Sequence, residues 1–136
     1  ADGFIPFDQK TTSEIEDYIK RFNINTVYGH TRNDGHQDHH NLSRATSAAA
    51  RKVPQILLYE CPSTETAFEP HFFEALDEAQ LNMKLDALKC YETQIAKGIV
   101  NLELIRATAR TNGGKIKLTF AEAFEVNHIV RPSQSV

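Results

Sequence analysis

The sequence predicts an α/β fold, a sheet with flanking helices, and two observations lead to this. Short apolar runs typical of buried strands alternate with longer segments in which apolar residues recur at helical spacing. Polar loops follow the strand-like runs at 26–28 and 55–60, as they do at the carboxyl edge of α/β sheets. Alternation of this kind is typical of helices packed on a sheet.

The first half of the chain is predicted to form a helix, a strand, a loop and a second helix. The first helix starts in the capping sequence 11–14 and ends at Asn23. Residues 26–28 form a short buried strand, and the polar segment 29–35 is a loop at its carboxyl end. The second helix ends before Pro54 and has an apolar face made of Leu42, Ala45, Thr46 and Ala49.

The second half continues with a buried strand at 55–60, a loop at 61–66 and a weak strand at 71–76. A long helix is expected through 81–95, with Gly98 as its terminator, and another from 102 to the glycines at 113 and 114. Residues 115–120 alternate as in a half-exposed strand, with Ile116, Leu118 and Phe120 inward. We expect one domain over residues 1–130 and a disordered tail at 131–136.

Composition excludes several classes of protein. The chain has 136 residues, 40% hydrophobic and 24% charged, with a net charge of −3, which suits one globular domain. No basic stripe suggests nucleic acid binding, and no run approaches the roughly 20 apolar residues of a membrane span. Cys61 and Cys90 lie in unrelated contexts, so we expect both to be reduced and buried in a cytoplasmic protein.

The chemistry is concentrated in a histidine cluster, since four of the six histidines fall between residues 30 and 40. His36 and His39 are three apart at a helix start, so they point to one side, and His39 should face inward while His40 faces solvent. Zinc takes imidazole and carboxylate ligands, three of them in a catalytic site. A His-x-x-His turn supplies one or two, and Asp38 can accept a hydrogen bond from a ring.

Simpler interpretations stand beside this one. His36 and His39 fit an ordinary helix start, and Asp34 fits its capping box better than a metal site. Glu122 is either an ion-paired glutamate or a pocket residue. His30 is expected to be a loop residue, and His71 and His128 to lie on the surface or to be satisfied in the core. Neither cysteine has a histidine at a recognisable spacing in the sequence, and no Gly-x-Ser-x-Gly elbow or phosphate-binding loop is present.

The run from Val27 to His39, ending in Asp-Gly-His-Gln-Asp-His, resembles the second motif of the LmbE-like (PIG-L) N-acetylglucosaminyl deacetylases. The resemblance continues in the same order through 58–64, 84–88, 91–94 and 121–124, and so covers nearly the whole chain. It implies a Rossmann-like fold with a mostly parallel sheet. It also implies a zinc ion, or another divalent metal, that activates water to remove an N-acetyl group from an amino sugar.

The resemblance also implies roles for individual residues. His39 would be a zinc ligand, and His36, as a histidinium, would stabilise the oxyanion and protonate the leaving amine, with Asp38 orienting it. Asp34 and Glu122 are candidates for residues near the substrate or behind the ligands. Family members are often oligomers, so we expect a homo-oligomer, or association with a missing N-terminal part.

The sequence departs from the family at the family's first motif, His-Pro-Asp-Asp-Glu. In the family this motif supplies the other zinc ligands and the general base, and it is absent from these residues. The sequence has no initiator Met, so we expect the fold to lack its N-terminal part. Two alternatives remain open. In the first, the chain is a non-catalytic α/β module that has lost the metal site. In the second, it is a metal-dependent hydrolase that acts on a bond other than an amide.

Overall fold

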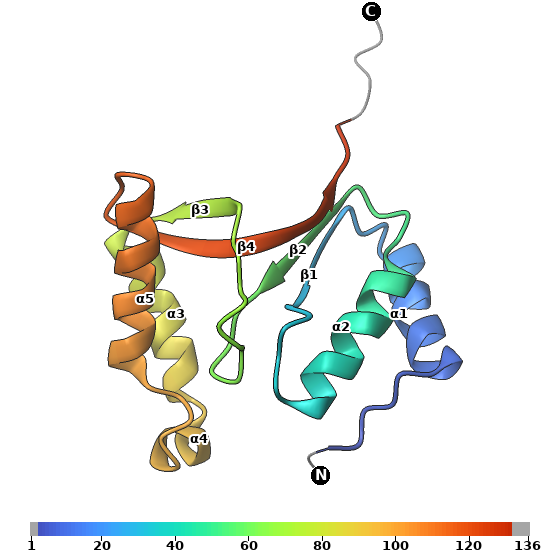
Figure 1. Ribbon diagram of the computed structural model, residues 1–136, viewed down its shortest axis with the longest axis horizontal. Helices are drawn as coiled ribbons and strands as arrows, with labels where there is room; N and C mark the ends of the chain where they lie inside the picture. The colour runs from blue at the N-terminus through green and yellow to red at the C-terminus, as the bar shows by residue number, and fades with distance from the viewer. Residues whose placement is uncertain (1–2, 132–136) are drawn as a thin grey trace, which may run out of the picture. The chain divides into compact units, whose positions relative to one another are not determined.

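The computed structural model describes residues 3–131, which form two compact units. The first unit contains the described residues up to His71 and those from Phe124 onward. The second unit is Phe72–Ala123. Figure 1 labels the helices and strands of both units, which are treated separately below.

The first unit begins with α1 (Gln9–Arg21), β1 (Thr26–His30), α2 (Gln37–Ala49) and β2 (Gln55–Tyr59). These elements match the prediction except at the helix starts. The side chain of Asp8 caps α1 by accepting the backbone N–H of Thr11, so the helix begins before the predicted capping sequence. His36 is the N-cap of α2, in place of the expected capping box from Asp34.

The sheet has the hydrogen-bonded order β1-β2-β4-β3. β1 and β2 are parallel, with Thr26 opposite Gln55 and His30 opposite Tyr59. β4 (Phe120–Ile129) continues from the second unit into the first and runs antiparallel to β2, with Tyr59 opposite Phe124. Because β1 and β2 are parallel neighbours, the loops after them leave the sheet at the same edge.

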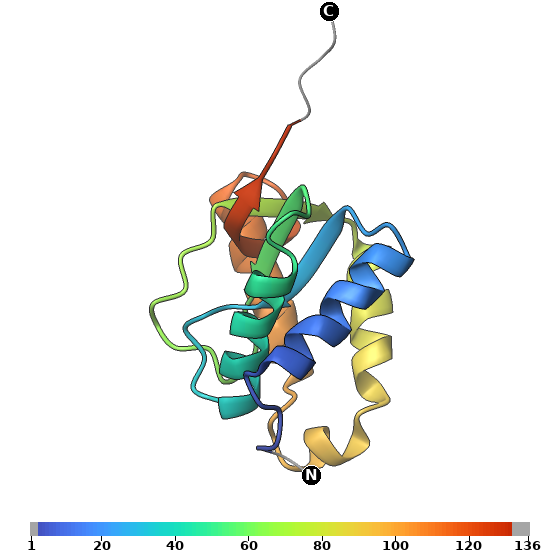
Figure 2. The ribbon, with the colours of Figure 1, turned by 90° about the vertical axis from the view of Figure 1, so that its right-hand side faces the viewer.

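The core of the first unit lies between the sheet and two helices. Its buried residues are Ala50, Val53, Ile56 and Leu58, with Ile19 and Val27 packed against them. α1 and α2 contact each other, as both views show, and α2 also contacts β1 (Figure 1, Figure 2). A Cβ on Gly29 would lie 3.3 Å from the Thr46 side chain, so the glycine allows β1 and α2 to approach closely.

The second unit contains β3 (Phe72–Leu76), α3 (Glu78–Lys89), α4 (Glu92–Ala96), α5 (Leu102–Lys115) and the start of β4. A capping box joins Asp77 and Gln80 at the start of α3. The core of this unit is formed by Leu81, Ala109 and Phe120, with Leu76 and Leu85 beside them.

Three predictions for the second unit were wrong. The long helix is broken at Cys90 into α3 and α4, although Gly98, with φ of 71°, does follow its end. α5 continues through its glycines to Lys115, and a Cβ on Gly113 would lie 2.7 Å from the backbone of Phe120. The glycine therefore permits close packing on β4 instead of ending the helix. The predicted strand 115–120 is a helix end and a turn, and β4 begins at Phe120.

The α/β fold class is confirmed, with a parallel β1–β2 pair and an antiparallel β2–β4 pair. The single domain over 1–130 stays a prediction, and the expected tail lies outside the described residues apart from Arg131. Within residues 3–131 no helix is both long and apolar enough to cross a membrane. A cytoplasmic location stays a prediction. Both cysteines are free, but Cys61 is only half-buried and Cys90 is exposed.

Candidate metal and catalytic site

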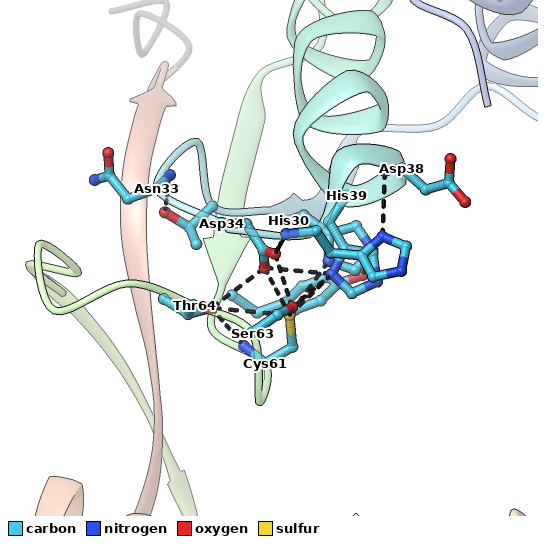
Figure 3. A network of polar contacts seen from close by, with 11 residues as sticks. His30, Asn33, Asp34, Asp38, His39, Cys61, Ser63 and Thr64 are labelled. Atoms are coloured by element: carbon cyan, nitrogen blue, oxygen red, sulfur yellow. Dashed lines mark hydrogen bonds and ion pairs between the residues drawn. The ribbon is translucent and has the colours of Figure 1, made fainter. Parts of the chain in front are cut away.

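A compact group of polar side chains lies where β1 and β2 end. His30 is the last residue of β1, Asp34 lies in the following loop, and His39 is in the first turn of α2. Cys61 and Ser63 come from the loop after β2. Figure 3 shows these side chains converging, with the Asp38 carboxylate pointing away from them.

The start of α2 is held by two short-range hydrogen bonds. His36 caps the helix, because its Nδ1 accepts the backbone N–H of Asp38 at 3.2 Å. The backbone N–H of His36 donates to Asp34 Oδ1 at 2.8 Å. The Asp38 carboxylate accepts the backbone N–H groups of Gly3 and Ile5 at 2.7 and 2.9 Å, so it fastens the preceding segment to the helix start.

The Asp34 side chain has no exposed surface and is the anchor of the group. It accepts the Ser63 hydroxyl at 2.7 Å and the Cys61 thiol at 2.8 Å, and its Oδ2 lies 3.3 Å from His39 Nδ1. Burial opposes ionisation of Asp34, but hydrogen bonds from Cys61, the His36 N–H, Ser63 and His39 outweigh it and lower the pKa to about 2. Asp34 is therefore a carboxylate at neutral pH.

The His39 ring lies between two other imidazoles. Its centroid is 4.0 Å from that of His30 and 4.6 Å from that of His36, with interplanar angles of 7° and 27°. Its Nδ1 lies 3.1 Å from Ser63 Oγ and 3.3 Å from Cys61 Sγ. The side chain keeps 29% of its surface exposed, so the ring is positioned inward, as expected, while still reaching solvent.

Burial keeps the surrounding groups uncharged at neutral pH. It lowers the pKa of His30, with help from the nearby His39, and it raises the pKa of Tyr59. Burial and the hydrogen bond to Asp34 raise the pKa of the Cys61 thiol. The Tyr59 hydroxyl lies 3.2 Å from His30 Nε2, which ties this ring to β2.

The two loops that carry the site are bonded to each other through the backbone. The Gly35 N–H donates to the Ser63 carbonyl at 3.0 Å, and the Glu65 N–H donates to the Asn33 carbonyl at 2.8 Å. The Asn33 side chain also donates to the Ala67 carbonyl at 3.2 Å. The side chains contributed by the two loops are therefore held in register.

Four side chains of this group could bind a metal ion, since ligand atoms of His30, Asp34, His39 and Cys61 all lie within 4.8 Å of one another. Imidazole, carboxylate and thiolate donors suit zinc. The rings of His30 and His39 are nearly parallel, however, so their in-plane lone pairs do not converge on one point. The donor set fits a metal through His39, and His30 would have to rotate to join it.

Comparison with known proteins places this site in context. No protein-family model matches the sequence. The chain is 41% identical over 86 residues to the uncharacterized deacetylase YaiS of Escherichia coli (strain K12). The resemblance to deacetylases is confirmed. The match covers 60% of this chain and 46% of YaiS, so the chain spans about half the length of this relative.

Two solved structures share the fold of this chain. The conserved protein TT1542 from Thermus thermophilus superposes with a TM-score of 0.78 at 22% identity, over 98% of this chain and 66% of that one. The N,N'-diacetylchitobiose deacetylase from Pyrococcus horikoshii superposes with a TM-score of 0.64 at 13% identity, over 89% and 52% of the two chains. At these identities the two structures establish the fold alone.

The structure brings most of the predicted site residues together. Asp34, His36 and His39 lie together at the helix start and in the loop before it. Asp38 belongs to the same helix turn, but the expected hydrogen bond from a ring was wrong, because its carboxylate bonds the N–H groups of Gly3 and Ile5 instead. Glu122 lies instead on β4 within the second unit, where it forms an ion pair with Lys84. The interpretation of Glu122 as an ion-paired residue is thus the one that the structure supports.

Sequence reasoning missed three members of the group and placed two other histidines well. His30 was expected to be a loop residue, and neither Cys61 nor Ser63 was singled out for the site. Their signal was positional, because His30 ends one of two parallel strands, and Cys61 and Ser63 follow the other, at the same edge of the sheet. His71 is exposed, and His128 Nε2 bonds the Val53 carbonyl at 2.6 Å.

Proposed function

We propose that this chain is part of a zinc-dependent N-deacetylase that hydrolyses an N-acetyl group on an N-acetylglucosamine-type amino sugar or conjugate. The observation that carries the proposal is the adjacent pair of His36 and His39 imidazoles at the ligand-binding edge of the sheet. The deacetylase relative and the His39 imidazole, a donor that suits zinc, support it. The identities of the metal and of the sugar are parts of this proposal.

His39 is the residue that would hold the metal. Its ring is oriented by Asp34, in the arrangement of carboxylate, histidine and metal that fixes ligand histidines in many proteins. When bound, zinc supplies Lewis-acid chemistry and lowers the pKa of a water molecule toward about 7. The remaining ligands and the general base would come from protein outside these 136 residues, in an oligomer or in the rest of the protein.

His36 would meet the acetyl oxygen and the leaving amine. Such a donor is worth on the order of 10²-fold or more in rate. In this conformation His36 Nδ1 accepts the Asp38 N–H, so the ring acts as a neutral donor through Nε2. A histidinium, as the resemblance implies, would have to give up this cap. Asp38 would support His36 by its charge and by holding the segment that precedes α1 against the helix start.

The test uses the protein that contains this chain, stripped of metal and reloaded with zinc. Acetate release is measured from N-acetylglucosamine, from N,N'-diacetylchitobiose and from an acetyl ester, alongside zinc content. We expect amide hydrolysis that depends on zinc. His39→Gln should lose the metal, and His36→Gln should keep zinc while losing turnover by about 10²-fold or more. His40→Gln, at an exposed neighbouring position, is the matched control and should change neither.

Other outcomes decide between the alternatives. Full zinc occupancy in His39→Gln would remove that residue from the ligand set. Protein that binds no zinc and releases no acetate would instead be a non-catalytic module. Hydrolysis of the ester without the amides would indicate a hydrolase of another kind.

A further inference from the structure

We propose that the structure fixes the neighbouring imidazoles of His36 and His39 in opposite tautomers, with the proton on Nε2 of His36 and on Nδ1 of His39. At their Nε2 atoms, the His36 ring then carries an N–H donor and the neighbouring His39 ring carries a lone pair. The tautomers follow from the hydrogen bonds of this chain alone. Their use in binding metal and substrate rests on the proposed function.

The proton of His36 is placed by the helix cap. A backbone N–H can only donate, and the Asp38 N–H points at His36 Nδ1 from 3.2 Å. Nδ1 must therefore carry a lone pair. A neutral imidazole has one proton, which leaves it on Nε2.

The proton of His39 is placed by the groups around its Nδ1, which lie at 3.1–3.3 Å (Figure 3). Asp34 is a carboxylate and can only accept. The Ser63 hydroxyl and the Cys61 thiol both donate their hydrogens to Asp34, at 2.7 and 2.8 Å, so they face His39 as acceptors. Three acceptors around one nitrogen require that this nitrogen carry the proton.

Stacking confines the plane of the His39 ring, and the contact with Asp34 decides which edge of the ring carries Nδ1. His39 lies against His36 on one side and His30 on the other, at centroid distances of 4.6 and 4.0 Å. The backbone N–H of His36 donates to the same carboxylate that accepts from His39, at 2.8 Å. Turning the His39 ring over about its Cβ–Cγ bond would keep the ring plane but would put a carbon in place of Nδ1 beside Asp34, so this contact would be lost.

The tautomer of His39 decides which of its two ring nitrogens, Nδ1 or Nε2, can bind a metal. With its Nδ1 protonated, His39 binds a metal through Nε2, on the side of the ring away from Cys61. Cys61 is then not a ligand, although its sulfur lies 3.3 Å from the ring. Asp34 and Ser63 become positioning residues that act through His39, and His36 Nε2–H is a donor that needs no positive charge.

The direct test is a long-range ¹H–¹⁵N correlation spectrum of the chain, labelled with ¹⁵N-histidine, free of metal and at a pH where the rings are neutral. Assignment comes from His36→Gln and His39→Gln. We expect the Nε2–H pattern for His36 and the Nδ1–H pattern for His39. The same tautomer in both rings, or averaged patterns, would overturn the proposal, and this measurement needs no variant of Asp34.

A second measurement tests the positioning role. In Asp34→Asn an amide N–H faces His39, so we expect the Nε2–H tautomer to appear there and Co²⁺ affinity to fall by about 10- to 100-fold. Asp38→Asn is the matched control, because the Asp38 side chain bonds Gly3 and Ile5, and it should leave His39 unchanged. An unchanged His39 pattern in Asp34→Asn would refute the role.

The side on which the metal binds is read from the Co²⁺ complex of the protein that contains this chain, because the remaining ligands lie outside these residues. We expect no thiolate-to-cobalt charge-transfer absorption, and the same spectrum in Cys61→Ser. A charge-transfer band that disappears in Cys61→Ser would place the metal on the Nδ1 side and overturn the proposal. Opposite tautomers in a protein that releases no acetate would leave this inference standing and remove only the proposed function.

Discussion

The Asp34 carboxylate should contribute to stability in a way that depends strongly on pH. Its pKa is lowered from the usual 3.8 to about 2 by the donors that surround it. A group whose folded pKa is depressed stabilises the protein fully above its unfolded pKa and loses that contribution as the pH falls toward the folded pKa. The lowering to about 2 corresponds to roughly 2 kcal/mol of unfolding free energy.

Asp34→Asn removes this contribution and nearly preserves the shape of the side chain. At pH 7 the variant should be less stable by roughly 2 kcal/mol. The gap should begin to close below about pH 4 and should nearly vanish near pH 2, because the wild-type carboxylate is protonated over that range.

The assay is urea unfolding at several pH values between 7 and 3, followed by the NMR signals of β1 and β2 amides. These strands report on the unit that contains Asp34. Asp17→Asn is the matched control, since Asp17 is exposed on α1 of the same unit. Its effect should stay within about 0.5 kcal/mol at every pH. A constant difference between wild type and Asp34→Asn down to pH 3 would refute the reasoning.

Two further predictions test the packing and the thiols. Gly113→Ala should destabilise the protein by about 1–3 kcal/mol in urea unfolding, since its Cβ would meet the β4 backbone at 2.7 Å. Gly114→Ala meets nothing within 4 Å and should gain up to about 1 kcal/mol, so equal effects would contradict the packing argument. At pH 8, Cys61 should react with a disulfide reagent about tenfold or more slowly than exposed Cys90, because partial burial and the bond to Asp34 raise the pKa of its thiol; equal rates would contradict this.

Local patterns in the sequence were enough to predict much of the fold. The apolar spacing of α1 and α2 and the runs at β1 and β2 are set by neighbours within a few residues, so their places were predicted. The histidines at the start of α2 were found for the same reason. The end of α5 was not predicted correctly. The glycine at position 113 is required by its close contact with Phe120 on β4, and no local pattern reveals this.

The part of the site that sequence reasoning missed depends on contacts across the sheet. Cys61 and Asp34 meet only because β1 and β2 pair in parallel, which the residues of either loop do not reveal by themselves. Asp38 was assigned to His36 from its position between two histidines. Its carboxylate in fact bonds Gly3 and Ile5, a contact that spans more than thirty residues and has no local signal.

The backbone bonds between the loops at 31–35 and 61–67 have a consequence for protein engineering and for divergence among relatives. Each loop supplies acceptors for N–H groups of the other, and each supplies side chains to the group around Asp34. A graft of one loop from a relative would leave the other without its partners. The two loops should therefore be exchanged together, and among relatives a change in one loop should be accompanied by a paired change in the other.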